Sequence, residues 1–494
     1  MTRRQGPGAP EAKGLVFMAT DSQGRLGAEH RKTIRSHVMR GKNTRQGAPR
    51  KRKCTQTIAE RQIWAEDVSS VEFVSCGDIQ NSQALLPSRS ISPDWRQWEP
   101  LSVPRTPHDL SLIKFCEDLD SNSMGKIVYF CAKIKRIIYP VDRCCNVDVA
   151  NTVFFQWLLA DPAYLHATLY TVSVFFDVIA GRAPARATNY HLYRAVGALK
   201  SRVGNTDEAL TDATAAVVMS LAIVAECFGD LAAAELHFRG LRRIVEMRGG
   251  IDVFRHNGEL YSKLCRVDFG HAMATGGKPA FSGTMLSFTP FFRRSPELAA
   301  ARAETAPGFS GIFSVVKSLD PRLGVVLKDL HDFSQLANAM FDTGETMHPE
   351  HLHGLLTSAQ YRLLEMELGE DGGFAELMRL ALLAYLSTLF LRVPGVRMSF
   401  HFLGRRLKSA LMGIEPVTGL ERRLYGWCLV VGAISVLPDP DGEWSHERLS
   451  AMVSWLGITW EEVQRGLRQV AWIDATHGEA GAEVLAGHMM TRSK

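Results

Sequence analysis

The sequence lacks an apolar run long enough to cross a membrane. Its strongest apolar runs, at 213–225, 380–391 and 427–437, fall short of the roughly 20 residues that a membrane-spanning helix needs. The first residues are polar and glycine-rich, with no apolar core of the signal-peptide kind. We therefore expect a soluble intracellular protein that does not contact a membrane.

The sequence also lacks the cysteine spacings of zinc fingers and disulfide frameworks. None of the nine cysteines forms a C-x-x-C pair, and none has histidine or cysteine neighbours at metal-ligand spacing. We therefore predict buried, unpaired thiols in a reducing compartment, with no metal site and no cofactor. The nine positions are Cys54, Cys76, Cys116, Cys131, Cys144, Cys145, Cys227, Cys265 and Cys428.

Catalytic motifs are absent as well: there is no G-x-S-x-G, H-E-x-x-H, P-loop or G-x-G-x-x-G pattern. Residues 268–270 spell the Asp-Phe-Gly magnesium triplet of kinases, but no other kinase motif accompanies them, so we interpret the triplet as chance. Residues 275–278 resemble part of a phosphate loop, and we predict a helix-ending turn there. His351 and His353 are two residues apart and point to different faces of a helix, and His237 fits a packed helix position. These patterns predict a protein that is not an enzyme.

Positive charge is concentrated at the N-terminus. Residues 1–53 carry a net charge of +11, whereas the remaining residues carry −6. Two basic clusters about ten residues apart fit a two-part nuclear import signal, or contacts to DNA phosphates. The alternative is a charged tail that is solvated and binds nothing. Membrane binding is disfavoured, because the basic helix lacks a Trp/Phe/Leu face that could insert into lipid. The candidate residues are Arg31, Lys32, Arg35, Arg40, Lys42, Arg45, Arg50, Lys51, Arg52 and Lys53.

The chain is predicted to have four parts. Residues 1–53 form a basic arm that is mostly disordered with one short basic helix, and 54–106 form a linker that contains eight serines and four prolines. Residues 107–480 form an all-α domain, an array of αα-hairpins, and 481–494 form a tail. Helix-length apolar segments are expected at 109–118, 124–138, 148–160, 163–180, 187–203, 206–228, 231–248, 256–272, 324–342, 349–367, 373–391, 397–411, 419–436 and 459–473.

Helix-start signals support several of these segments. Asn205 precedes Glu208 by three residues and Thr459 precedes Glu462 by three, which is the spacing of a capping box. Asp230 is a suitable N-cap for the helix at 231–248, and the glycine pair at 249–250 ends it.

Several short motifs resemble those of the fungal-specific transcription factor domain proteins of filamentous fungi. Arg35-Ser36-His37-Val38-Met39-Arg40 is similar to their "RSHVMR" signature. Further similar segments in the body are 157–166, the stretch Gly229-Asp230 through His237, Gly240-Leu241 and Arg248-Gly249-Gly250, Arg266-x-Asp268, Gly277-Lys278-Pro279, and Trp460 with Trp472 and Asp474. The resemblance spans roughly residues 14–40 and 105–480, and the order of the motifs is more specific than each motif alone.

The resemblance implies a nuclear, often pathway-specific transcriptional regulator, for example of a biosynthetic gene cluster. It further implies that the helical domain mediates regulation, homo- or heterodimer contacts or effector binding. The expected partners are DNA, bound directly or through other factors, and the transcription machinery. Many relatives read DNA through a six-cysteine zinc cluster, but residues 1–53 contain no cysteine, so the cluster is not carried over. Two alternatives stay open: a transcriptional cofactor or interaction protein that does not touch DNA, and, more remotely, an all-α enzyme.

Overall fold

The chain divides into two units, Met1–Ser90 and Ile91–Lys494, and the described residues all lie in the second unit. The computed structural model describes residues 114–134, 138–145, 152–203, 205–281, 287–293, 308–368, 373–390, 400–437, 442–457 and 459–488. The predicted basic arm and linker lie outside these residues. Within the described ranges the fold is all-α, as predicted: there is no strand, and one isolated bridge joins Cys145 to Met347.

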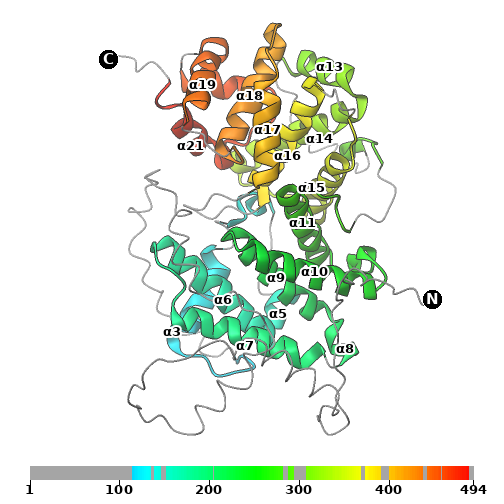
Figure 1. Ribbon diagram of the computed structural model, residues 1–494, viewed down its shortest axis with the longest axis vertical. Helices are drawn as coiled ribbons and strands as arrows, with labels where there is room; N and C mark the ends of the chain where they lie inside the picture. Colours follow the sequence, from blue (N-terminus) through cyan, green and yellow to red (C-terminus); the bar gives the residue numbers. More distant parts are fainter. Residues whose placement is uncertain are drawn as a thin grey trace, which may run out of the picture. The chain divides into compact units, whose positions relative to one another are not determined.

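The helices of the first half form successive hairpins, seen in cyan and green in Figure 1. The closest pairs are α6 with α7 and α9 with α10. The elements are α3 (Ser121–Tyr129), the π-helical turn η4 (Phe130–Ile134), the 3-10 turn η5 (Pro140–Cys144), α5 (Val153–Ala160), α6 (Pro162–Ile179), α7 (Arg186–Val203), α8 (Thr206–Ala209), α9 (Asp212–Cys227), α10 (Leu231–Met247), the 3-10 turn η7 (Ile251–His256) and α11 (Gly258–Thr275).

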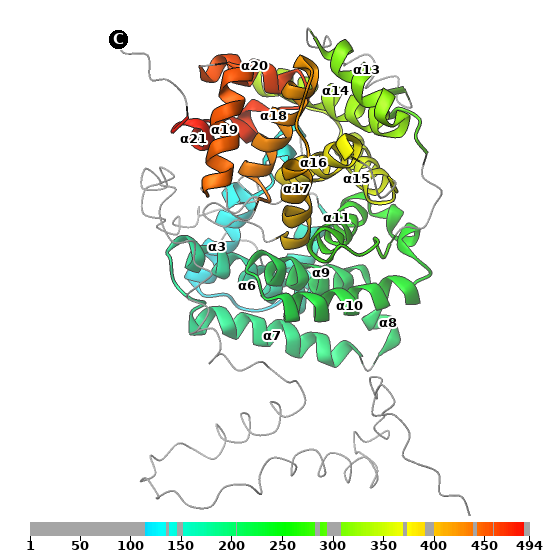
Figure 2. The same ribbon diagram turned by 45° about the horizontal axis from the view of Figure 1, so that its top comes forward.

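The helices of the second half lie together in Figure 2, where their colours run from light green at α13 to red at α21. Helices α11 and α15 pack on one another where the two halves meet. The elements are the 3-10 turn η8 (Phe291–Arg293), α13 (Phe309–Leu319), α14 (Pro321–Thr343), α15 (Pro349–Leu364), α16 (Gly373–Phe390), α17 (His401–Met412), α18 (Gly419–Ile434), α19 (Glu443–Leu456), α20 (Trp460–Arg468) and α21 (Asp474–Leu485).

The described residues contain two large hydrophobic cores. The first core gathers buried residues of α3 to α11, and Tyr361 of α15 joins it. The second core is formed mainly by α13 to α21, and residues at the end of α11, including Phe269 and Met273, reach into it. Helix α11 therefore contributes to both cores.

Helix α16 lies at the centre of the second core and contacts α15, α17 and α18. Among the described helices it alone is long and apolar enough to cross a membrane, but 72% of it is buried within the helical body. An amphipathic stripe suits a surface helix, whereas a helix that is apolar on all sides belongs inside a core. The helix predicted at 373–391 is confirmed over residues 373–390.

The motif at 157–166 is a helix junction. Asp161 caps α6 by accepting a hydrogen bond from the Tyr164 backbone N–H at 3.1 Å, and Pro162 occupies the first helical position. This position suits proline because its missing N–H has no partner inside the helix. The Asp161 carboxylate also binds Arg202 of α7 at 2.6 Å, which fixes α6 against α7.

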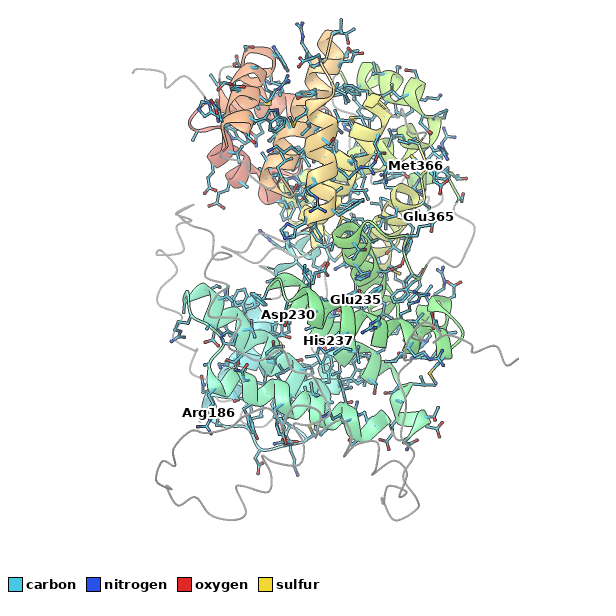
Figure 3. The ribbon with its side chains drawn as sticks, viewed as in Figure 1. Arg186, Asp230, Glu235, His237, Glu365 and Met366 are labelled. Atoms are coloured by element: carbon cyan, nitrogen blue, oxygen red, sulfur yellow. The ribbon has the colours of Figure 1, made fainter. Side chains whose placement is uncertain are left out.

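The motif at 229–250 is the α9–α10 hairpin. Gly229 has a positive φ of 74°, and Asp230 accepts a hydrogen bond from the Ala233 N–H, so the predicted N-cap is confirmed. The helix ends before Gly249 and Gly250, whose φ values of 97° and 106° favour glycine. Arg248 then closes the hairpin through a 2.5 Å ion pair with Asp212 at the start of α9. Figure 3 labels Asp230, which lies just before α10, and His237, which lies on α10.

Candidate functional site

None of the ten basic residues predicted for nuclear import or phosphate contact can be placed. All of them, from Arg31 to Lys53, lie outside the described residues. The described residues offer a different candidate site: two cavities inside the helical body that share three lining residues. Neither cavity was anticipated from the sequence.

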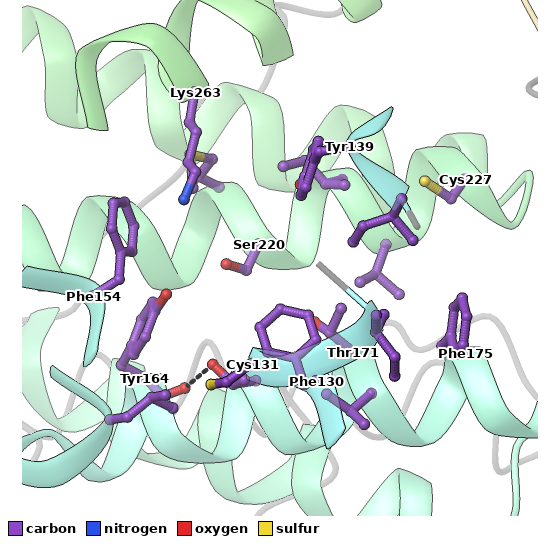
Figure 4. A pocket seen from close by; sticks show the side chains of 18 of the residues that line it. Phe130, Cys131, Tyr139, Phe154, Tyr164, Thr171, Phe175, Ser220, Cys227 and Lys263 are labelled. Carbon is purple, nitrogen blue, oxygen red and sulfur yellow. Dashed lines mark hydrogen bonds between the residues drawn. The ribbon is translucent and has the colours of Figure 1, made fainter. Parts of the chain in front are cut away.

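The first cavity has a volume of about 110 Å³ and lies among η4, α5, α6, α9 and α11. Figure 4 shows the aromatic rings of Phe130, Phe154 and Phe175 around it. Ile134, Ile138 and Val172 complete a small apolar cluster on the same wall with Phe175. A cavity with this lining favours an apolar occupant.

Three hydroxyl groups in the wall of the first cavity already donate hydrogen bonds to their own helices. Thr168 donates to the Tyr164 carbonyl at 2.9 Å, and Thr171 donates to the Ala167 carbonyl at 2.9 Å. Ser220 of α9 donates to the Ala216 carbonyl at 2.8 Å. Because each hydroxyl has one proton, none of the three is available as a donor to an occupant.

Lys263 of α11 lines both cavities, and its side chain is 15% exposed. Its Nζ donates to Glu259 at 2.8 Å and lies 3.6 Å from the centroid of the Phe154 ring. The carboxylate and the ring face both stabilise the ammonium charge. Figure 4 shows the side chain extending from α11 toward the first cavity.

The second cavity has a volume of about 60 Å³ and shares Tyr139, Ile223 and Lys263 with the first. Its other lining residues come from both halves of the fold: Glu226 of α9, Arg266, Val267, Phe269, Gly270 and Met273 of α11, Ser387 and Phe390 of α16, and Phe400. The second cavity therefore lies where the two cores meet.

Arg266 carries a buried positive charge with unused hydrogen-bonding capacity. Its side chain is 9% exposed, and both Nε and Nη2 are buried without a hydrogen-bond partner. Arg266 forms a long ion pair with Asp142 on η5: Nη2 and Oδ1 are 3.9 Å apart, beyond hydrogen-bond distance. Oδ1 of Asp142 is itself buried without a hydrogen-bond partner. The guanidinium lies 5.0 Å from the centroid of the Phe390 ring, which gives it a cation–π contact instead.

Glu226 is the second residue lining this cavity with a buried polar atom that lacks a hydrogen-bond partner. Its Oε1 is buried without a hydrogen-bond partner, and burial raises the pKa of its carboxyl to about 7. The carboxylate packs against Gly270: a Cβ atom at that position would lie 3.0 Å from Oε2. The basic side chain of Arg266 and the acidic side chain of Glu226 thus both line one small cavity, and each has a buried polar atom without a hydrogen-bond partner.

The sequence motifs that resembled catalytic sites have structural roles. Asp268, the first residue of the kinase-like triplet, accepts hydrogen bonds from the backbone N–H groups of Ala280 and Phe281 and from the Tyr361 hydroxyl, at 2.6, 2.9 and 2.8 Å. Burial raises the pKa of its carboxyl. Asp268 therefore ties the segment after α11 to α15.

The phosphate-loop-like segment is a helix-ending turn, as predicted. Helix α11 ends at Thr275, and Gly276 follows in the left-handed region with a φ of 76°. A side chain at this position would also collide with the Phe402 ring, 2.4 Å from the added Cβ. Lys278 forms an exposed ion pair with Glu367 at 2.8 Å.

The three histidines singled out from the sequence do not form a metal site in the described part of the chain, where no group of three or more candidate ligands occurs. His351 and His353 lie on α15 on either side of the buried Leu352. Burial lowers the pKa of His237 on α10, as expected for a packed histidine. Five of the seven described cysteines are buried, in line with the prediction of buried thiols.

Comparison with known proteins gives one match. Residues 127–271, less than half of the chain, match the family model of the fungal specific transcription factor domain. No curated protein and no solved structure matches the chain. The matched segment runs from α3 to α11 and so holds most of the first core, together with Glu226 and Arg266. The resemblance to fungal-specific transcription factor domain proteins is thereby confirmed over residues 127–271, and it supports a transcriptional regulator.

Proposed function

We propose that the protein is a nuclear, pathway-specific transcriptional regulator with a basic N-terminal arm and an all-α regulatory domain. The observation that carries the proposal is the match of residues 127–271 to the fungal specific transcription factor domain. This match favours a regulator over an all-α enzyme. The proposed partners are DNA, reached directly or through other factors, and the transcription machinery or other regulators, with the chain acting alone or as a homo- or heterodimer.

The basic arm is the proposed route to the nucleus and to DNA. The net charge of +11 in residues 1–53 supports contacts to an anionic partner. Each phosphate contact releases counterions, so that it adds about −0.9 to the slope of log affinity against log salt concentration. The arm lacks an evident base-reading element, so we expect it to bind all duplex sequences about equally.

The test compares two variants that each lose four positive charges. The arm variant changes Arg31, Lys32, Arg35 and Arg40 to alanine. The control variant changes four other basic residues to alanine: Lys200 of α7 and Arg239, Arg242 and Arg243 of α10. These four side chains are exposed in the described structure.

If the arm contacts phosphate, the arm variant should bind duplex DNA more weakly, with a salt slope that is flatter by a few units. If the arm is only an import signal, a tagged arm variant should move to the cytoplasm while DNA binding stays negligible. The control variant should change neither the DNA affinity nor the nuclear localisation. An arm variant that stays nuclear and keeps its DNA affinity would contradict the proposed role of the arm.

A second candidate function is a transcriptional cofactor that does not bind DNA. The absence of cysteine from residues 1–53 favours it, because these residues cannot hold the zinc cluster through which many relatives read DNA. Retention of the purified protein on DNA beads separates the two candidates. A regulator that binds DNA is retained and loses retention when residues 1–53 are deleted, whereas a cofactor is not retained in either form.

A further inference from the structure

We infer that the two cavities form one binding site for a small apolar carboxylic acid. The carboxylate binds the Nε and Nη2 edge of Arg266, and the apolar body of the acid occupies the first cavity. The inference rests on the geometry of the described residues and does not depend on what the N-terminal arm does.

The chemistry of Arg266 selects a carboxylate. Nε and Nη2 lie on the same edge of the guanidinium, and this edge binds a carboxylate through two parallel N–H···O bonds. Both atoms are buried and have no hydrogen-bond partner. A buried charge without hydrogen bonds is costly, so a site of this kind gains much from an occupant that supplies them.

The neighbouring groups do not accept hydrogen bonds from Nε and Nη2 of Arg266. Asp142, 3.9 Å from Nη2, is too distant for a hydrogen bond. Lys263, the other cation lining these cavities, is already bonded to Glu259. Glu226 also lines the second cavity, and burial raises the pKa of its carboxyl to about 7.

The volumes set the size of the ligand. The cavities measure about 110 and 60 Å³ and share three lining residues. An apolar cavity of about 150 Å³ is large enough to hold benzene. The two cavities together only slightly exceed that volume, so the site suits an acid of roughly eight non-hydrogen atoms whose apolar part is a short chain or one small ring.

The position of the site gives the ligand a structural effect. Residues of α9 and α11 from the first core and Phe390 of α16 from the second core line the same cavity. A bound acid would contact both cores at their junction. Binding should accordingly raise the thermal stability of the whole helical body.

The experiment uses the full-length protein and three acids: benzoate, cyclopentanecarboxylate and hexanoate. Each acid is paired with its neutral amide, which has nearly the same shape but no charge. Binding is measured by titration calorimetry and by the shift in melting temperature. We expect at least one acid to bind at least tenfold more tightly than its amide and to raise the melting temperature.

Two variants and a control locate the carboxylate contact. Arg266→Met removes the charge and should weaken binding of that acid at least tenfold. Arg266→Lys keeps the charge but lacks the two-donor edge, and it should also weaken binding. Arg243→Met, which removes an exposed arginine from α10, should leave the affinity within twofold of the wild type.

The unliganded variants show whether Arg266 also has a structural role. Arg266→Met leaves the buried Oδ1 of Asp142 without its nearby cation, so a fall in its melting temperature is expected with or without a binding role. Arg266→Lys keeps the cation, so its loss of affinity for the acid is a readout that a purely structural role would not produce. The inference is contradicted if no acid binds, if acids and amides bind equally, or if both Arg266 variants keep the wild-type affinity.

Discussion

A fully buried ion pair in the second core illustrates how the protein handles charge at single residues. Arg362 of α15 and Asp329 of α14 are 0% and 1% exposed, and their side chains meet at 2.8 Å. Asp329 also accepts a hydrogen bond from the Phe291 backbone N–H at 2.9 Å. The pair thus connects α14, α15 and η8 inside the core.

Arg362→Met should destabilise the protein by about 3–5 kcal/mol, because it leaves the Asp329 carboxylate buried without its charged partner. Unfolding by urea measures the loss. Arg322→Met is the matched control, since Arg322 forms its 2.7 Å pair with Asp320 at a half-exposed site. We expect that change to cost less than about 1 kcal/mol. Equal losses in the two variants would contradict this account.

Glu226 predicts a pH dependence of stability. Its pKa is about 7 in the folded protein and near 4.5 in the unfolded chain, so the folded state binds more protons between these values. The group therefore lowers stability as pH rises from about 4.5 to 7. Glu226→Gln should be more stable than the wild type by up to about 3 kcal/mol above pH 7, and this difference should vanish below about pH 4.5.

The measurement is urea unfolding of both proteins across this pH range. The exposed Glu443→Gln on α19 serves as the control. A difference between Glu226→Gln and the wild type that does not vary with pH would show that the Glu226 carboxyl titrates alike in the folded and unfolded states.

At the scale of elements, two aspartate N-caps allow a matched comparison. Asp230 caps α10 at an exposed site, whereas Asp161 caps α6 and also binds Arg202, with both side chains mostly buried. Asp230→Ala should cost about 1 kcal/mol, the usual value of a cap. Asp161→Ala should cost about 3 kcal/mol, since it also removes a charged hydrogen bond. Chemical denaturation of the two variants tests the order, and the reverse order would contradict the assigned contacts.

Several helices with a side-chain cap could be predicted from the sequence. The Thr459–Glu462 capping box is present at the start of α20, and the capped helices α6, α10, α14 and α15 lie close to their predicted ranges. Helices α13, α19 and α21 were not predicted. The residues just before them, Gly308, Gly442 and Ile473, provide no side-chain cap. Tertiary packing, rather than a local signal, therefore sets where these helices begin.

Two predicted helices were too long because polar contacts interrupt them. The segment 206–228 divides into α8 and α9, because Thr211 adopts an extended backbone and caps α9. The segment 459–473 ends early, at Arg468, and Asn338 of α14 bonds both the Trp472 carbonyl and the Asp474 N–H.

The prediction of a helix at 109–118 was wrong for the residues of this segment that the structure describes. Residues 114–118 of the segment 109–118 are not helical. Phe115 is buried in the first core, and Glu117 pairs with His166 and Arg194.

At the scale of the whole molecule, the candidate cavities could not be predicted, because their residues come from distant parts of the chain. Glu226 and Arg266 lie on two different helices, and Phe390 belongs to the second half. In the sequence, Arg266 stands out only as part of the Arg266-x-Asp268 motif that resembles the family. Its burial depends on the packing of α11 against both cores, and no local periodicity encodes that packing.

Removal of residues 1–60 should leave the helical circular dichroism and the melting temperature nearly unchanged. The reason is that the predicted linker at 54–106 is too polar to couple the arm to a body that has its own apolar cores. A fall of about ten degrees, which corresponds to several kcal/mol for a body of this size, would show instead that the arm packs on the body.

The central claim is that the protein acts on chromatin as a transcriptional regulator. A genome-wide crosslinking map of the tagged full-length chain, with an untagged strain as control, tests this most directly. We predict discrete occupied sites upstream of genes, and weaker occupancy when Arg31, Lys32, Arg35 and Arg40 are changed to alanine. A map without enrichment over the untagged control would contradict the claim.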